Sequence, residues 1–443
     1  MKKILVKIYL WYLRFFARMQ LRKLKPLIVG VGGASGKSST ALLISEVLGQ
    51  KFSLKQSKGK NSETGVPLSI LGIELRDYNL LEWAKVLLLV PWRTLTNNKK
   101  YDIYVIEMGI DSPLPPKNME YLLSIVKPSV GVLTNIDIEH SAYFDPLVNE
   151  EDELERKNKI LKLISRQEGL LLESINESGS AVVNLDDPNI KALLPLRSKT
   201  ITISSKDNSA DFYLSKISVD RQGFSIQFEF LKEKYQIQLP QPLPEYFAYS
   251  FILAIATSFV CGVSVDEAIG VIESNFTLPP GRFSVFKGIK NSTILDSSYN
   301  SSLEPAIGAI ELLSKIGKGR RVGILGDMRE LGSLSKIQHE ILAKAILGNL
   351  DFAIIIGPMI SEYVSPILTN AKFPFIAFQS FKEAKNSILE NIKQDDLILV
   401  KGSQNTLYLE RVVEILLDDK NDSNSLCRRG EFWDKVRKET SNT

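Results

Sequence analysis

The chain alternates short apolar runs with longer segments in which apolar positions recur every three or four residues. The runs have the length of buried strands, and the longer segments have the period of helices that are apolar on one face. This alternation predicts an α/β fold in which mostly parallel sheets are covered by helices. Strands are predicted at 27–31, 103–107, 130–134, 181–184, 294–296, 321–325, 352–357, 375–378 and 396–400, and helices at 37–49, 154–165, 247–261, 265–274, 304–315, 335–347, 381–390 and 406–417.

Two stretches organise the chain into domains. Residues 211–240 read as a local antiparallel meander around Arg221-Gln222-Gly223. The prolines of LPPGR (278–282) follow a predicted helix and precede a new strand, which marks a domain boundary. We therefore expect a leader at 1–25, a central domain at 26–279, a second α/β domain at 280–418, and a polar tail at 419–443 that runs over the surface.

The leader is basic and amphipathic. Its pattern predicts a helix with a basic stripe about 100° wide. It has no uninterrupted apolar stretch of about 20 residues, which argues against a spanning helix, and no small-residue cleavage site, which argues against a signal peptide. The helix either docks on the domain surface or lies at the surface of an anionic membrane. The stripe consists of Lys3, Lys7, Arg14, Arg18, Arg22 and Lys25.

Composition narrows the class of protein. The 443 residues suffice for two or three domains with their own cores. Residues 1–45 carry nine Lys or Arg and no acid, whereas the rest carries 46 basic and 51 acidic residues. The body is therefore not the basic surface of a nucleic-acid-binding protein. Cys261 and Cys427 lie far apart without metal-ligand spacing, which favours a reducing compartment and hence the cytoplasm.

The sequence IVGVGGASGKSSTALLI (28–44) is the most informative stretch. It fits G-x-x-G-x-x-G-K-[ST], with Gly30, Gly33 and Gly36 followed by Lys37 and Ser38. Glycines let the backbone N–H groups approach a phosphate, the lysine adds a positive charge, and the hydroxyl can bind Mg²⁺. The order strand, glycines, Lys-Ser and helix predicts a phosphate-loop NTPase-type domain.

Further polar residues follow predicted strands. Glu107 ends an apolar strand, where a carboxylate can hold Mg²⁺ beside a nucleotide. Asn135 and His140 follow the next strand in VGVLTNIDIEH. Lys157 and Lys159 stand near the start of a helical pattern in ERKNKIL.

Taken together, these segments resemble the Mur ligase family, the ATP-dependent amide-forming ligases of peptidoglycan precursor synthesis. The resemblance runs from about Pro26 to Leu417. Within the family, it is strongest to the branch that adds D-alanyl-D-alanine to a UDP-muramoyl-tripeptide. The matching segments are GVGGASGKSS, NSETGVPLSILG, IEMG with TNIDIEH, VNLDDP, LDSSYNSSLEPAIGAIELL, and RVGILGDMRELGSLSKIQH with LILVKGSQN.

The resemblance implies a role for each matching residue. The implied ATP-binding residues are Gly30, Gly33, Gly36, Lys37, Ser38, Ser39, Asn135, Arg282 and Asp296. Two Mg²⁺ ions are implied, held by Ser38, Glu107, His140 and Lys157, the last carbamylated by CO₂. Residues implied on the side of the substrates, UDP-muramoyl-peptide and D-Ala-D-Ala, are Asn61, Ser62, Asp327 and Glu330. The implied catalytic set is Lys37, Glu107, His140 and Lys157.

Several positions depart from the family pattern. Lys159 stands where K-x-E-[IL] has a glutamate, Ser62 replaces an asparagine, and YFAYS (246–250) replaces H-N-x-x-N. The family's sugar-nucleotide domain is not expected, because a single helix precedes Gly30. We expect a monomeric ligase in the cytoplasm, with possible peripheral contact with the inner membrane face. Two alternatives remain: a Mur-type ligase with another acceptor, and a weakly catalytic ATP-binding scaffold at the membrane.

Overall fold

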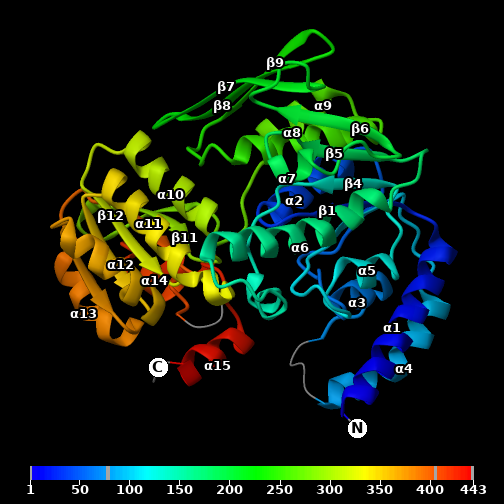
Figure 1. Ribbon diagram of the computed structural model, residues 1–443, viewed down its shortest axis with the longest axis horizontal. Helices are drawn as coiled ribbons and strands as arrows, with labels where there is room; N and C mark the ends of the chain where they lie inside the picture. The colour runs from blue at the N-terminus through cyan, green and yellow to red at the C-terminus, as the bar shows by residue number, and fades with distance from the viewer. Residues whose placement is uncertain (1, 76–79, 404–406, 441–443) are drawn as a thin grey trace. The chain divides into compact units, whose positions relative to one another are not determined.

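The computed structural model describes residues 2–75, 80–403 and 407–440, and its internal contacts divide the chain into two units (Figure 1). The first unit comprises residues 1–217, 226–237 and 247–276, and the second comprises 218–225, 238–246 and 277–443. Each unit is an α/β fold with a mostly parallel sheet, which confirms the predicted fold class. The main division follows residue 276, where the sequence predicted a boundary after 279.

The first unit is organised by a nine-stranded sheet in the order β2-β3-β1-β4-β5-β6-β7-β8-β9. The pairs from β2 through β7 are parallel. In register, Val31 pairs with Glu107 and Gly32 with Leu133, so the carboxyl ends of β1, β3 and β4 meet at one edge. The strands are β1 Leu27–Gly32, β2 Leu54–Gln56, β3 Ile103–Glu107, β4 Val130–Leu133, β5 Ser180–Asn184, β6 Lys199–Ser204, β7 Phe212–Asp220, β8 Gly223–Phe230 and β9 Glu233–Leu239.

Helices cover this sheet. α2 packs against α8 and α9, and α8 is buried along most of its length because nearly all of its residues are apolar. The predicted helix at 154–165 is longer in the structure, and β2, β6, α3, α4, α5 and α7 were not predicted. The helices are α2 Lys37–Gly49, α3 Gly65–Leu71, α4 Leu80–Thr96, α5 Met119–Leu123, α6 Glu153–Glu173, α7 Pro188–Lys191, α8 Phe247–Val260 and α9 Val265–Asn275.

The leader forms α1 (Lys2–Leu24), which packs on α3 and α4 (Figure 1). Leu13 is fully buried in a cluster that includes Leu71 and Val90. The Tyr9 hydroxyl donates to the Trp83 carbonyl at 3.2 Å. The helix is therefore docked on the first unit. Among the described helices, none combines the length and the apolar character needed to cross a bilayer.

The second unit contains a six-stranded sheet in the order β10-β11-β15-β12-β13-β14. Only the β10–β11 pair is antiparallel. α10, α11 and α12 pack in sequence, while α13 and α14 join a separate core cluster with β11, β12, β13 and β15. The elements are β10 Ser284–Lys287, β11 Thr293–Ser297, α10 Leu303–Ile316, β12 Arg321–Gly326, α11 Ser335–Asn349, β13 Phe352–Ile356, α12 Pro358–Asn370, β14 Phe375–Phe378, α13 Phe381–Asn391, β15 Leu397–Lys401, α14 Glu410–Leu416 and α15 Glu431–Thr440.

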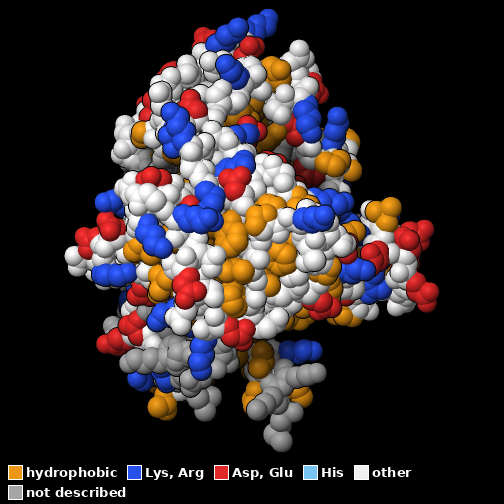
Figure 2. Space-filling model, turned by 90° about the vertical axis from the view of Figure 1, so that its left-hand side faces the viewer, with side chains coloured by type: hydrophobic (Ala, Val, Ile, Leu, Met, Phe, Trp, Pro, Cys, Tyr) orange, Lys and Arg blue, Asp and Glu red, His pale blue; other side chains and the backbone are white. Residues whose placement is uncertain are grey.

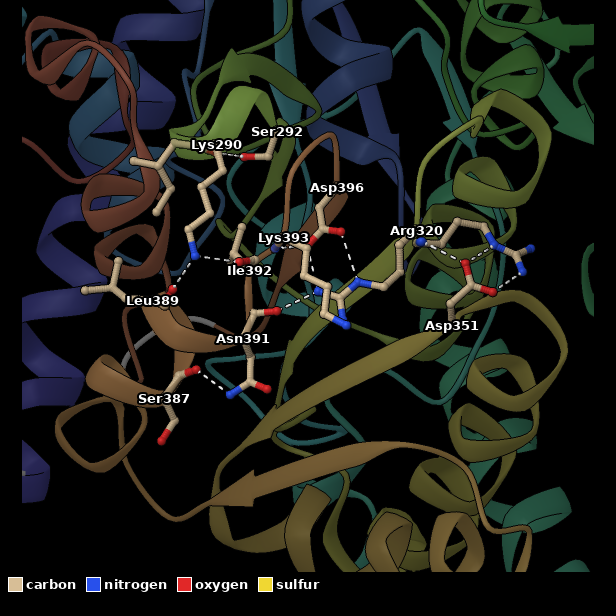
Figure 3. A network of polar contacts seen from close by, with 12 residues as sticks. Lys290, Ser292, Arg320, Asp351, Ser387, Leu389, Asn391, Ile392, Lys393 and Asp396 are labelled. Carbon is tan, nitrogen blue, oxygen red and sulfur yellow. Dashed lines mark hydrogen bonds and ion pairs between the residues drawn. The ribbon is translucent and has the colours of Figure 1, made fainter.

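A polar network ties the amino ends of these strands together (Figure 3). Arg320 donates to both carboxylate oxygens of Asp396, at 3.0 and 2.7 Å, and to the Asn391 carbonyl at 2.6 Å. Lys290 reaches the Ile392 carbonyl at 2.7 Å. The network lies at the end of the sheet opposite the carboxyl ends of the strands, so we assign it a structural role.

Part of the surface of the second unit is apolar. Figure 2 shows hydrophobic side chains gathered among Lys, Arg, Asp and Glu on the side that lies at the left of Figure 1. In the same unit, β14 is the edge strand, and Phe375, Ile376 and Phe378 are only half-buried. Phe381 begins α13 close by in sequence.

The tail differs from the expected surface segment. Cys427 and Arg428 are buried, and the Arg428 guanidinium donates to the Glu410 carboxylate at 3.0 Å. A helix, α15, then begins at Glu431. The polar start of the tail hid this docking, because the buried contact is made by an arginine whose partner is an acid on α14. The predicted helix at 406–417 begins at residue 406, which lies outside the described residues; α14 begins at Glu410.

Candidate active site

The phosphate loop connects β1 to α2. Gly33 and Gly36 adopt positive φ angles of 119° and 78°, a region that glycine enters without steric cost. A Cβ atom at Gly33 would lie 2.2 Å from the Thr134 hydroxyl oxygen. Gly30 lies within β1, where a Cβ atom would lie 2.9 Å from the Met108 sulfur. The glycines thus serve the turn and the close packing around it.

Asn135 and Thr134, which follow β4, hold the loop from the neighbouring strand. The Ser35 N–H donates to Asn135 Oδ1 at 2.9 Å, and Asn135 Nδ2 donates to the Ser35 hydroxyl at 2.8 Å. The Thr134 hydroxyl donates to the Ser35 carbonyl at 2.7 Å. Asn135 therefore holds the loop through two hydrogen bonds. An amide side chain suits this position because it can donate one bond and accept the other.

Lys37 begins α2 and folds over the loop. Its ammonium group donates to the carbonyls of Gly33 and Ala34, the latter at 2.6 Å. The backbone N–H groups at the start of a helix also attract anions. The loop therefore combines a cation with helix N–H groups, which is the arrangement that binds a polyphosphate.

Ser38, in the first turn of α2, and Glu107, the last residue of β3, lie next to each other beside the phosphate loop. The Ser38 hydroxyl donates to Glu107 Oε2 at 2.7 Å, and Glu107 is almost fully buried. The Glu107 N–H donates to the Ser57 hydroxyl at 3.1 Å. A hydroxyl and a carboxylate oxygen beside a phosphate loop are ligands that Mg²⁺ prefers. Ser39, the next residue, is buried within α2.

His140 and Lys157 lie on the segments that follow β4. His140 has a φ of 58° and precedes a short 3₁₀ turn at Ser141–Tyr143. Lys157 lies near the start of α6 and is partly exposed. Lys159, on the same turn of α6, pairs with Glu150. The structure thus places His140 and Lys157 on different elements.

Glu168 was not predicted, although it lies beside the phosphate loop. It belongs to α6, is only 2% exposed, and its Oε2 accepts the Gly33 N–H at 3.0 Å. Burial raises the pKa of its carboxyl to about 7, although the Lys37 charge, the Gly33 N–H and His140 lower it. The available signal in the sequence was a glutamate between apolar residues on the buried side of a helix.

Asn61 and Ser62 occupy the loop before α3. The Asn61 side chain packs against Gly109, two residues after Glu107, where a Cβ atom would lie 3.0 Å from Asn61 Nδ2. The Ser62 hydroxyl accepts the Gly65 N–H at 3.1 Å. Asn61 therefore lies near the carboxyl end of β3, where Glu107 is placed, whereas Ser62 makes a local contact at the start of α3.

Asp296 and Arg282 belong to the second unit. Asp296 is the second-to-last residue of β11 and is fully buried, and its Oδ1 accepts the Ser298 N–H at 3.0 Å. Among the described residues, its Oδ2 is one of the few buried oxygens without a hydrogen-bond partner. Burial raises its pKa to about 6, opposed by the bonds from Ser298. The Arg282 guanidinium lies 4.7 Å from the centre of the Tyr299 ring.

Asp327 and Glu330 follow β12. Asp327 Oδ1 accepts the Ile360 N–H at 2.8 Å, so this carboxylate contacts the start of α12. Burial raises the pKa of Asp327, against the bonds from Ile360 and Met359. Glu330 is exposed, with a φ of 63°. Asp327 thus has a structural contact of its own besides its implied substrate role.

The side chains around the phosphate loop are suited to a nucleotide, but they do not form a preformed metal site made of protein ligands alone. Within the part of the chain that the structure describes, no group of three or more His, Cys, Asp or Glu residues forms a metal cluster. Ser38 and Glu107 nevertheless offer paired oxygen donors beside the loop. An ion that is also bound by phosphate oxygens needs only one or two protein ligands of this kind.

Comparison with known proteins agrees with this geometry. The profile of the Mur ligase middle domain matches residues 31–258, and that of the Mur ligase glutamate ligase domain matches residues 281–404. A UDP-N-acetylmuramoyl-tripeptide–D-alanyl-D-alanine ligase from Buchnera aphidicola subsp. Baizongia pistaciae is 27% identical over 402 residues, which is 88% of this chain and 75% of that protein. The protein of the same name from Bacillus subtilis is 23% identical over 419 residues, 94% of this chain and 81% of the relative.

Solved structures share the fold. The MurF ligase of Thermotoga maritima in complex with ADP superposes with a TM-score of 0.73 at 23% identity, covering 97% of this chain and 84% of that one. MurF from Acinetobacter baumannii gives a TM-score of 0.73 at 20% identity, covering 92% and 80%. Because the two family profiles match most of the chain, and the phosphate loop lies within the first of them, the chain belongs to the Mur ligase family of ATP-dependent, ADP-forming amino-acid ligases of peptidoglycan precursor synthesis.

Proposed function

We propose that the chain joins D-Ala-D-Ala to a UDP-muramoyl-tripeptide. The γ-phosphoryl group of ATP is transferred to the peptide carboxylate and ADP leaves; the amine then attacks the acyl carbon and phosphate leaves as the amide forms. The observation that carries the proposal is the phosphate loop with Lys37 above it and the Ser38–Glu107 pair beside it. The choice of substrates is supported by the relatives that share this name.

The residues around the phosphate loop have different tasks in that reaction. Lys37 neutralises charge on the transferring phosphoryl group, and Asn135 keeps the loop in shape. Ser38 and Glu107 would hold Mg²⁺, which, when bound, offsets the negative charge of the phosphates. A second ion at His140 stays a prediction. The carbamate that the family resemblance implies at Lys157 also stays untested, and the buried carboxylate of Glu168 is an alternative source of the same charge. A monomeric state and the lack of a nucleic-acid partner also stay predictions.

Omission of each substrate in turn tests the proposed reaction. The full chain is mixed with ATP, Mg²⁺, a UDP-muramoyl-tripeptide and D-Ala-D-Ala, and ADP release is followed together with the mass of the product. We expect ADP release to require both substrates. Release with the tripeptide and a different amine would instead identify another Mur-type ligase. Release that ignores both substrates would contradict ligation and favour the scaffold.

We also propose that the chain binds the surface of an anionic membrane through α1 and α4. The exposed side of α1 carries Trp11, Phe15 and Met19, which are 56%, 46% and 40% exposed. Beside them, Arg14, Arg18 and Arg22 form a parallel row, and the two rows line a hollow of about 220 Å³. Aromatic residues and arginines side by side suit the headgroup region of a bilayer.

α4 extends the apolar surface next to α1. Leu88, Trp92 and Leu95 are 80%, 64% and 73% exposed, although α4 also contributes Val86 and Val90 to the core shared with α1. Exposed apolar side chains of this size on two packed helices are typical of an interaction surface. The neighbouring basic residues favour anionic lipid, at roughly 1 kcal/mol for each one near the surface.

Point substitutions on the exposed side test membrane binding better than a deletion, because α1 also supplies Leu13 to the core. We expect the double variant Trp11→Ser/Trp92→Ser to lose at least about fivefold in sedimentation with phosphatidylglycerol vesicles at low salt, because buried apolar area is lost. ADP release in solution should stay within twofold.

The matched control is Leu154→Ser, at an exposed leucine on α6. This variant should bind vesicles like the unaltered chain. If the unaltered chain ignores anionic vesicles at low salt, or if the double variant sediments as well as the control, α1 only packs on the first unit and the membrane proposal is wrong.

A further inference from the structure

A buried carboxylate from α6 lies directly under the phosphate loop. Glu168 Oε2 accepts the Gly33 N–H at 3.0 Å, and its charge interacts with Lys37 and His140. Glu168 is thus within electrostatic reach of a residue implied in phosphate binding and of one implied in metal binding. None of the sequence motifs assigns it a role.

The backbone around Glu168 is built for this approach. A Cβ atom at Gly32 would lie 2.9 Å from Glu168 Oε2, so only glycine at this position leaves room for the carboxylate. Gly32 is the last residue of β1 and is not one of the glycines of the phosphate-loop pattern. The absence of a side chain there is explained by the carboxylate and by a Leu171 methyl group, which would also lie 2.9 Å from a Cβ atom, and not by the phosphate.

Lys157 lies on the same helix, α6, but at a different position along the helix axis. Eleven residues separate it from Glu168, which corresponds to about three turns and about 16 Å along the axis. Both residues therefore lie on one side of α6. Only Glu168 makes a hydrogen bond to the loop in the structure, whereas Lys157 is near the start of the helix and partly exposed.

We propose that Glu168, an encoded carboxylate, supplies the negative charge beside the phosphate loop and the metal site that the family resemblance assigns to carbamylated Lys157. This inference rests on the proposed ligase function. A carbamate and a carboxylate both offer a negatively charged pair of oxygens, which are ligands that Mg²⁺ prefers. A glutamate provides them without CO₂ and without a neutral lysine amine.

A purely structural role for Glu168 makes a different prediction. In that case the side chain serves only as the acceptor for the Gly33 N–H. Glutamine has nearly the same shape and keeps a carbonyl oxygen for that bond, but it carries no charge. Glu168→Gln therefore separates the charge from the hydrogen bond. Glu173→Gln, at an exposed position on the last turn of the same helix, is the matched control.

The test uses the full chain and Mn²⁺ as the probe, with and without ADP, followed by electron paramagnetic resonance. We expect Glu168→Gln to weaken Mn²⁺ binding in the presence of ADP at least tenfold. Lys157→Ala and Glu173→Gln should stay within twofold of the unaltered chain. The protein is also incubated with ¹³C-bicarbonate and followed by nuclear magnetic resonance. We expect the unaltered chain and Lys157→Ala to show the same spectrum, without a carbamate resonance from Lys157. ADP release should not depend on bicarbonate.

Three results would overturn the inference: unchanged Mn²⁺ affinity in Glu168→Gln, a ¹³C-carbamate resonance lost in Lys157→Ala, or an inactive Lys157→Ala enzyme that short carboxylic acids rescue. If Glu168→Gln does not fold, the two Lys157 measurements decide alone. Mn²⁺ binding with ADP needs no acceptor substrate. A chain that binds Mn²⁺ through Glu168 but makes no amide would therefore disprove the proposed function and leave this inference standing.

Discussion

Lys37→Ala is expected to lower ADP release by at least about a thousandfold, because it removes the positive charge that stabilises the transferring phosphoryl group. The fold should be unaffected. The Lys37 ammonium donates to the carbonyls of its own loop, Gly33 and Ala34, and its charge acts on Glu168, but it contributes nothing to the apolar core. The measurement is steady-state ADP release with both substrates present, together with the melting temperature of the variant.

Lys51→Ala is the matched control for this variant. Lys51 follows α2, is exposed, and donates to the Gly262 carbonyl at 2.8 Å, far from the loop at the other end of the helix. ADP release by this control should remain normal. If Lys37→Ala retains near-normal release as well, Lys37 does not hold the transferring phosphate.

Arg428→Ala is expected to lower the free energy of unfolding of the second unit by about 3–5 kcal/mol, because it leaves the Glu410 carboxylate buried without its cation. Both side chains are nearly excluded from water, at 3% and 0% exposure, and are joined at 3.0 Å. Arg428 also donates to the carbonyls of Ser298 and Tyr299, next to Asp296. Urea denaturation followed by circular dichroism measures the loss.

The adjacent Arg429 provides the control. It pairs with Glu414 at 3.1 Å, but these side chains are 23% and 39% exposed, so the pair is worth no more than about 1 kcal/mol. Arg429→Ala should therefore shift the urea midpoint only slightly. Equal losses for the two arginine variants would mean that the buried pair does not stabilise the tail, and that the tail is as dispensable as its polar sequence suggested.

The Lys37 and Arg428 variants test two kinds of feature, one defined by a local sequence pattern and one defined by a contact between distant segments. The phosphate loop was predictable because every property that defines it is local: a strand, glycines at fixed spacing, Lys37 and a helix. Glu107 was predictable for a similar reason, since a carboxylate directly after an apolar strand must lie at the strand's carboxyl end. The tail was not predictable, because nothing near Arg428 in sequence indicates that Glu410 is buried beside it.

Three of the elements that were not predicted show why a sequence pattern can fail. β2 has three residues and α5 has five, too few for a period to be visible. α4 is apolar over much of its circumference and contains Pro91, so its pattern resembles neither a one-sided helix nor a strand. Its partner is α1, and only that contact shows which of its residues are core and which are exposed.

The α/β class, the phosphate loop and the strand-end position of Glu107 could be read from the sequence, because spacing and local periodicity carry this information. The resemblance to a ligase family could also be recognised, because its motifs are contiguous segments of the chain. The tertiary structure alone decided which acid lies under the loop. Glu168 follows Gly33 by 135 residues, and the pattern of a helix shows which side is buried but not what that side packs against. The contact depends on how α6 lies against β1, which is set by packing between distant segments and not by either segment's own sequence.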